Sequence, residues 1–165
     1  MPADFAPLIR SLNGHKVEYV IVGGMAAVVL GVPIVTRDFD LCYRQSRDNA
    51  ARLAGALAPF HPRLRGVDEP VPFRFDAATI QMGCNFTLST DVGDVDALGH
   101  LSGLGGYEQI INSAEQLPMF GEPVFVMSLE DLVKAKQAAG RTKDKLQLIE
   151  IEATLRLRKK LKPND

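Results

Sequence analysis

Residues 19–43 read YVIVGGMAAVVLGVPIVTRDFDLCY, and this stretch decides the fold. It begins as an apolar β-type run, turns at Gly23-Gly24, continues as a short apolar helix and ends in a strand that carries Asp38 and Asp40. Acidic side chains are costly to bury, so a strand with two of them usually needs their charge. We therefore hypothesise that the two aspartates hold a divalent metal and that the two glycines cradle a phosphate.

The spacing of the two aspartates places both side chains on one face of the strand, because residues two apart in a strand point the same way. The intervening residues then point to a core on the other face. Neighbouring carboxylates repel each other unless a cation neutralises them, and Mg²⁺ favours carboxylate oxygens. Alternatively, Asp38 and Asp40 are solvated on an exposed strand face or paired with Arg37 or Arg44.

A second acidic strand is predicted in the sequence GDVDAL, where Asp94 and Asp96 again lie two residues apart. If the two acidic strands are neighbours, three or four carboxylates converge, which is about the set that a two-metal phosphoryl-transfer site needs. Asp96 is the better third ligand, because apolar core residues flank it on both sides. Asp94 follows Gly93 and could instead be a turn residue.

The rest of the chain predicts an α+β domain with a small mixed sheet, flanking helices and a helical C-terminal end. Apolar spacing, β-branched runs and turn residues predict helices at 5–12, 48–57, 75–82, 107–111, 129–139 and 142–161, and further strands at 17–22, 84–89 and within 117–127. Residues 59–72 are predicted to form a loop. We expect a single domain over residues 1–165, with a core at about 17–127 and C-terminal helices at about 128–161.

The two C-terminal helices carry their own signals. Ser128 is a predicted N-cap, and Gly140 is a natural stop between the helices. In the last helix, Leu146, Ile149, Ala153 and Leu157 are predicted to share one face. The segment from residue 134 to 162 has ten basic and three acidic residues, although the whole chain has a net charge of −1.

Composition places the protein among ordinary soluble globular chains. Of its 165 residues, 46% are hydrophobic and 24% are charged. Its two cysteines fit buried thiols in a reducing compartment better than a disulfide framework. Neither a signal peptide nor an apolar run of about 20 residues is evident, so we expect a cytoplasmic protein without a membrane partner.

Taken together, these motifs resemble the nucleotidyltransferase superfamily of the polymerase-β type. The pattern is G-G, a spacer of 13 residues, D-F-D and a third acidic residue on a later strand. The segment LEDLVKAKQAAGRTKD is similar to the Leu-rich, Lys-containing, Arg-x-Lys-Asp segment of minimal and toxin-associated members. The resemblance spans most of the chain, from about residue 17 to residue 148.

The resemblance implies a role for each residue that matches the motifs. Mg²⁺ would be the cofactor and ATP or another NTP the substrate. The carboxylates that would ligate the metal and activate the acceptor are Asp38, Asp40 and Asp96. The glycines and cations that would contact the triphosphate are Gly23, Gly24, Lys136, Arg141 and Lys143. Asp144 falls in the same motif. Met25 stands where many members have Ser, so phosphate binding would rely on backbone N–H groups.

Three functions are consistent with these observations. The first is a Mg²⁺-dependent nucleotidyltransferase that moves a nucleoside monophosphate from an NTP to a protein or RNA hydroxyl. The second is a catalytically weak, nucleotidyltransferase-like binding partner in a toxin–antitoxin or defence system. The third is an RNA-binding module that uses the basic C-terminal sequence RLRKKLK, although such a stretch is more usually a solvated helix end.

Overall fold

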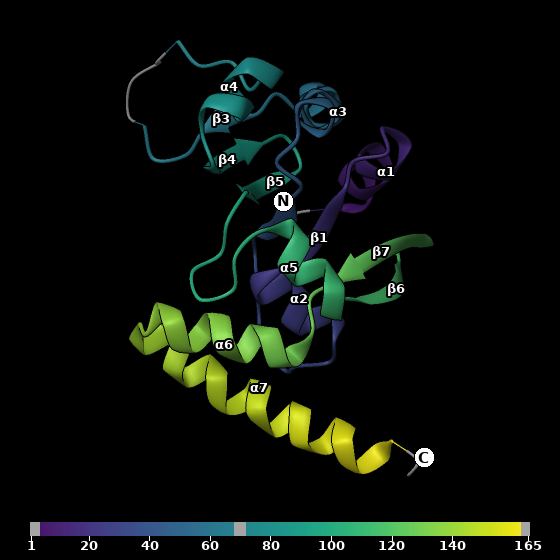
Figure 1. Cartoon of the computed structure of the whole chain (residues 1–165), viewed down its shortest axis with the longest axis vertical. Coiled ribbons are helices and arrows are strands. Elements are labelled where there is room, and N and C mark those ends of the chain that lie inside the picture. Colours follow the sequence, from purple (N-terminus) through teal and green to yellow (C-terminus); the bar gives the residue numbers. More distant parts are fainter. Residues whose placement is uncertain (1–3, 68–71, 163–165) are drawn as a thin grey trace.

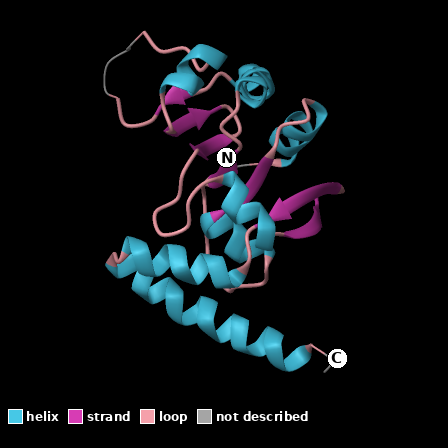
Figure 2. Ribbon diagram, viewed as in Figure 1, coloured by secondary structure: helices cyan, strands magenta, loops and turns pink. Residues whose placement is uncertain are grey.

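The fold is a seven-stranded mixed sheet with helices packed on and beside it (Figures 1 and 2). A computed structural model describes residues 4–67 and 72–162. The strands are β1 (Tyr19–Val22), β2 (Phe39–Tyr43), β3 (Arg63–Leu64), β4 (Asn85–Thr90), β5 (Gly93–Leu98), β6 (Glu115–Met119) and β7 (Glu122–Val126). The α-helices are α1 (Ala6–Gly14), α2 (Gly23–Val29), α3 (Arg47–Leu57), α4 (Ala77–Met82), α5 (Tyr107–Ile110), α6 (Leu129–Ala139) and α7 (Thr142–Leu161).

The sheet has the strand order β3-β4-β5-β2-β1-β7-β6. Strand β1 is antiparallel to β2 and parallel to β7, while β2 is parallel to β5. Both faces of β1 are buried, as its unbroken apolar sequence YVIV predicts. The prediction of an α+β domain with a small mixed sheet and a helical C-terminal end is confirmed.

The prediction of a loop from residue 59 to residue 72 is wrong at its start. A 3₁₀ turn occupies Ala58–Phe60, and Arg63–Leu64 form the short strand β3 at the edge of the sheet. Strand β3 pairs with β4, with Leu64 opposite Leu88. Two residues are too few to show an alternating pattern, so the pairing with β4 rather than the local sequence creates this strand. Residues 68–71 of the predicted loop lie outside the described residues.

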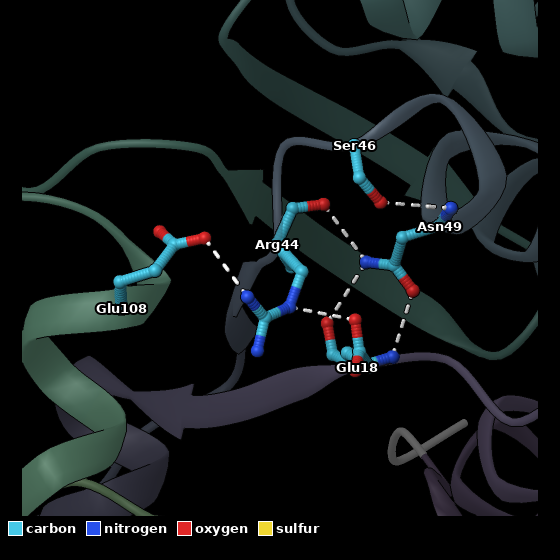
Figure 3. Close-up of polar contacts among 5 residues, drawn as sticks. All are labelled: Glu18, Arg44, Ser46, Asn49 and Glu108. Carbon is cyan, nitrogen blue, oxygen red and sulfur yellow. Dashed lines mark hydrogen bonds and ion pairs between the residues drawn. The ribbon is translucent and has the colours of Figure 1, made fainter.

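Buried Asn49 ties the outer ends of β1 and β2 to helix α3 (Figure 3). Its side-chain oxygen accepts from the Glu18 N–H at 2.8 Å, and its amide nitrogen donates to the Glu18 and Arg44 carbonyls at 3.0 and 2.9 Å. The Ser46 hydroxyl caps the helix by accepting from the Asn49 N–H at 3.2 Å. A polar residue is therefore buried here because it completes the hydrogen bonding of two strand ends.

Replacing Asn49 with alanine should lower the free energy of unfolding by about 2–3 kcal/mol, because it leaves buried backbone groups of Glu18 and Arg44 without partners. Urea unfolding followed by circular dichroism measures the change. Arg52→Ala is the matched control, since Arg52 is exposed on the same helix and should shift the free energy by less than about 0.5 kcal/mol. Equal effects of the two substitutions would contradict the role of Asn49.

Helices α6 and α7 form a hairpin at one end of the molecule (Figure 1). Helix α6 begins as predicted, because Ser128 accepts from the Asp131 N–H at 3.1 Å. It ends at Gly140, whose positive φ of 65° lets the chain reverse. None of the helices in the described ranges combines the length and apolar character needed to cross a membrane.

Helix α7 packs on the rest of the molecule through a different face from the predicted apolar one. Ile151 is buried, and Leu155 packs against the core. Leu146, Ile149 and Leu157 share a face as predicted, but their side chains are 57–64% exposed to solvent. The helix carries two apolar stripes, and the sequence pattern does not determine which of them meets the core.

Candidate functional site

Three aspartates meet on one face of the sheet, where β2 and β5 run side by side. Parallel pairing places Asp40 opposite Asp96 and, one step away, Phe39 opposite Val95. Phe39 and Val95 are fully buried on the other face, as the alternation of the two sequences predicts. Carboxylate oxygens of Asp38, Asp40 and Asp96 lie within 4.8 Å of one another. We call these three residues the acidic cluster.

The Gly-Gly pair forms the start of α2 and approaches the acidic cluster closely. Gly23 has φ of 65°, and a Cβ atom at this position would overlap the Asp40 carboxylate. A Cβ atom at Gly24 would lie 2.8 Å from the Thr36 hydroxyl oxygen. Both positions therefore require glycine because the chain passes directly over the segment that carries the aspartates.

Asp40 is the most strongly perturbed member of the acidic cluster. Burial raises the pKa of its carboxyl to about 7; the negative charges of Asp96 and Asp38 act in the same direction, and Lys136 opposes them. Its Oδ1 atom is buried and has no hydrogen-bond partner among the described residues. A buried carboxylate oxygen beside two more carboxylates fits a hard divalent cation such as Mg²⁺.

The raised pKa of Asp40 predicts that the metal-free protein loses stability as pH rises from about 5 to 8. The folded state keeps a proton on Asp40 where the unfolded chain, with a carboxyl pKa of about 4, has lost it. The free energy of unfolding should fall by roughly 1–3 kcal/mol across this range. Urea unfolding with EDTA at several pH values measures it.

Asp40→Asn removes this titration, so the variant should show a flatter pH profile than the unaltered protein. Asp48→Asn is the matched control, because Asp48 is exposed on α3 and should keep the original profile. A profile for Asp40→Asn as steep as that of the unaltered protein would show that other groups cause the pH dependence.

Arg65 holds the third carboxylate in place, although no sequence motif marks it. Its guanidinium donates to Asp96 Oδ1 at 2.7 Å and to the Leu88 carbonyl at 2.8 Å, and lies 3.5 Å from an oxygen of Asp94. Arg65 follows directly after β3, so this short edge strand delivers it to the site. A charge-assisted hydrogen bond of this kind restricts the orientation of Asp96.

A second charged group faces the acidic cluster from the α6–α7 hairpin. Asp144 is fully buried, and its carboxylate accepts from Lys136 Nζ at 3.2 Å and from Arg141 Nε at 2.7 Å. The hydrogen bond from Arg141, followed by that from Lys136, lowers the pKa of Asp144 to about 2. Asp144 therefore keeps two cations oriented at the N-terminal end of α7.

Two cavities adjoin the acidic cluster and the hairpin cations, and both are lined by Asp40, Asp96, Lys136 and Arg141. One has a volume of about 420 Å³ and adds polar and basic residues: Gly24, Thr36, Arg37, Asp38, Lys143 and Gln147. The other has a volume of about 320 Å³ and adds mainly apolar residues with a few polar ones, including Leu98, His100, Leu101, Leu132 and Asn85.

The structure brings together the residues that the sequence singled out, with three differences. Asp94 lies on β5 but outside the acidic cluster. Arg44 does not pair with the aspartates; it binds Glu18 and Glu108 instead (Figure 3). Thr36 and Arg65 join the site although no motif marks them. Thr36 stands two residues before the Asp pair, which is the one local signal that could have indicated it.

Comparisons with known proteins agree with this geometry at the level of the fold. No protein-family model matches the sequence, and no curated protein sequence does. A proposed nucleotidyltransferase of Thermotoga maritima superimposes with a TM-score of 0.52 at 20% identity, over 93% of this chain and 88% of that one. An antigenic nucleotidyltransferase-like protein of Paracoccidioides brasiliensis superimposes with a TM-score of 0.52 at 16% identity, over 91% of this chain and 72% of that one. The chain thus has a nucleotidyltransferase-like fold with an acidic cluster, and the resemblance inferred from the motifs is confirmed at the level of the fold.

Proposed function

We propose that this chain is a Mg²⁺-dependent nucleotidyltransferase that transfers a nucleoside monophosphate from an NTP to a hydroxyl group of a protein or an RNA. The observation that carries the proposal is the acidic cluster facing Lys136 and Arg141 across shared cavities. In the reaction, the acceptor oxygen bonds to the α-phosphorus while the bond from this phosphorus to the bridging oxygen breaks. Pyrophosphate leaves and the acceptor loses its proton.

Mg²⁺ would be held by Asp38, Asp40 and Asp96, whose oxygens converge within 4.8 Å. When bound, the ion would neutralise phosphate charge and polarise the α-phosphoryl group. Asp96 is the carboxylate we assign to the acceptor, because Arg65 fixes its orientation by a 2.7 Å contact and it can accept the hydroxyl proton.

The larger, basic cavity suits the triphosphate. Arg37, Lys136, Arg141 and Lys143 bring positive charge to its walls, and such charge stabilises the departing pyrophosphate. Gly24 lines this cavity and Gly23 lines the smaller one, and both would contribute backbone N–H groups in place of the hydroxyl that Met25 lacks. Asp144 holds Lys136 and Arg141 before substrate arrives, which lowers the cost of ordering them.

The smaller cavity suits the nucleoside. Leucines at positions 98, 101 and 132 supply apolar surface for a base, and Asn85 and His100 stand at its wall as hydrogen-bonding groups. It shares Asp40 and Asp96 with the basic cavity, so a nucleotide lying across both would place its α-phosphate beside the acidic cluster. We place this chemistry in the cytoplasm, where NTPs are available and Cys42 and Cys84 stay reduced.

Nucleotides labelled at either end of the triphosphate test the proposal. The protein is incubated with Mg²⁺ and each of the four NTPs, in the presence of total RNA and cell extract as acceptors. Label at the α-phosphate should appear in RNA or protein, and label at the γ-phosphate should appear in pyrophosphate. Thermal unfolding with Mg²⁺ and each NTP provides a binding measurement that does not depend on the acceptor.

Each result has a defined meaning for the proposal. Transfer of the γ-label to a macromolecule would identify a kinase-type reaction instead. Failure of every NTP to raise the melting temperature in the presence of Mg²⁺ would exclude a nucleotide site. In that case the second function, a nucleotidyltransferase-like partner acting by protein contact, would replace the first.

A further inference from the structure

The outer face of α7 presents a continuous apolar stripe to solvent. It consists of Leu146, Ile149, Ala153, Leu157 and Leu161, spaced three or four residues apart along one side of the helix. Its four large side chains are 57–74% exposed, and they make up four of the ten exposed large apolar side chains among the described residues. The stripe is about 22 Å long at 1.5 Å per residue. Figure 1 shows α7 at the edge of the molecule, on the far side of α6 from the sheet.

Charged residues beside the stripe are arranged in two blocks. Glu150 and Glu152 lie near the middle of α7, and the basic residues Arg156, Lys159 and Lys160 follow toward its C-terminal end. Glu152 and Arg156 lie on the same side of the stripe, because four residues separate them on the helix. Neither of these two side chains forms an ion pair within the described ranges 4–67 and 72–162.

We propose that the stripe binds the same stripe of a second copy of this chain, with the two α7 helices antiparallel. An antiparallel overlap of residues 149–161 places the small Ala153 of each copy opposite Leu157 of the other. It also places Glu152 of each copy beside Arg156 of the other, which forms two equivalent ion pairs across a two-fold axis. The acidic block of one helix then faces the basic block of its partner.

Self-complementarity is the reason for choosing a second copy over another occupant. A stripe flanked by charges of one sign would suit a partner of opposite charge. This stripe is flanked by an acidic block and a basic block, and an antiparallel second copy presents the same two blocks in the reverse order. Lys143 and Lys145 precede the overlap, so the partner helix does not bring its basic end against them. The nucleotide cavities involve α7 at Arg141, Lys143, Asp144 and Gln147, before the overlap begins, so the pairing leaves them open.

Sedimentation velocity over a range of protein concentrations tests the pairing. The unaltered chain should be a dimer that dissociates on dilution. The double substitution Ile149→Glu with Leu157→Glu should raise the dimer dissociation constant by about 100-fold or more, because four carboxylates would enter the apolar contact. Met82→Glu is the matched control: Met82 is 90% exposed on α4, away from the stripe, and its substitution should leave the constant unchanged.

A charge exchange tests the antiparallel arrangement itself. Glu152→Arg alone and Arg156→Glu alone should each weaken the dimer, since each makes two like-charged contacts. An equimolar mixture of the two single variants should recover dimerisation. In a mixed dimer, the arginine introduced at position 152 meets the glutamate introduced at position 156, and the remaining Arg156 of one copy meets the remaining Glu152 of the other. The double variant Glu152→Arg with Arg156→Glu also restores both pairs within one chain and should dimerise like the unaltered chain.

Three results would overturn the proposal. An unaltered chain that stays monomeric at every concentration would show that the stripe has another occupant, and salt-dependent RNA binding by that monomer would identify it. A dimer that survives Ile149→Glu with Leu157→Glu would use another surface. A double charge-exchange variant no stronger than the single variants would exclude the antiparallel pairing. Circular dichroism of each variant confirms that a lost dimer is not a lost fold.

Discussion

Replacing both Asp38 and Asp40 with asparagine should abolish nucleotidyl transfer while leaving the fold intact. The substitution removes two of the three carboxylates whose oxygens converge within 4.8 Å. A bound divalent cation contributes several kcal/mol of transition-state stabilisation, so the rate should fall by about 10³-fold or more. Transfer of label from the α-phosphate of the preferred NTP measures this loss.

The same substitution should not destabilise the metal-free protein, because the acidic cluster is a source of repulsion without a cation. Burial and neighbouring carboxylates raise the pKa of Asp40 to about 7, so a neutral amide is better tolerated there at pH 8. The melting temperature in EDTA should be equal or higher, and the stabilisation by Mg²⁺ should disappear. Asp48→Asn with Asp91→Asn is a matched double control at exposed positions. Full activity in Asp38→Asn with Asp40→Asn would refute the assignment.

The convergence of the three aspartates could be predicted because it depends on strand alternation. In both β2 and β5 an aspartate alternates with apolar residues, so burying Phe39 and Val95 forces Asp40 and Asp96 to the opposite face. The hypothesis that the two strands are neighbours then brings the carboxylates together. Such a pattern survives even when the surrounding loops are predicted incorrectly.

The contribution of Arg65 could not be predicted, because it depends on a contact between distant parts of the chain. Strand β3 has two residues and exists through its pairing with β4. Arg65 therefore reaches Asp96, which is 31 positions away in sequence, through an element that has no sequence pattern of its own. The close approach of the glycines could not be predicted either. The positions of Gly23 and Gly24 suggested contact with a phosphate, but only the structure shows that their backbone lies against Asp40 and Thr36.

The orientation of α7 shows why an apolar stripe does not by itself identify a core-facing surface. Leu146, Ile149 and Leu157 form a regular stripe, yet Ile151 and Leu155 on another side of the helix meet the core. Buried Asp144 decides between them, because Lys136 and Arg141 can satisfy its carboxylate in one rotation of the helix. An acidic residue, which the sequence marks as polar, thus sets the packing of the helix.

Replacing Asp144 with alanine should therefore strongly destabilise the hairpin. It leaves the Lys136 ammonium, whose side chain is 13% exposed, without its buried partner, and the expected loss is about 3 kcal/mol in the free energy of unfolding at pH 7. The adjacent Lys145→Ala, at an exposed position, should have little effect. Urea unfolding of both variants provides the comparison.

The cause of that loss can be separated from simple loss of packing in two ways. Adding Lys136→Met to Asp144→Ala should recover part of the stability, because the unpaired cation is then absent. The pH dependence gives the second test: with a pKa of about 2 in the folded state and about 4 in the unfolded chain, Asp144 stabilises the fold above pH 4 and loses this effect as pH falls toward 2. The difference in the free energy of unfolding between the unaltered protein and Asp144→Ala should therefore decrease as the pH falls from 4 to 2. A constant difference, together with no recovery from Lys136→Met, would mean that Asp144 acts by filling space and not by its charge.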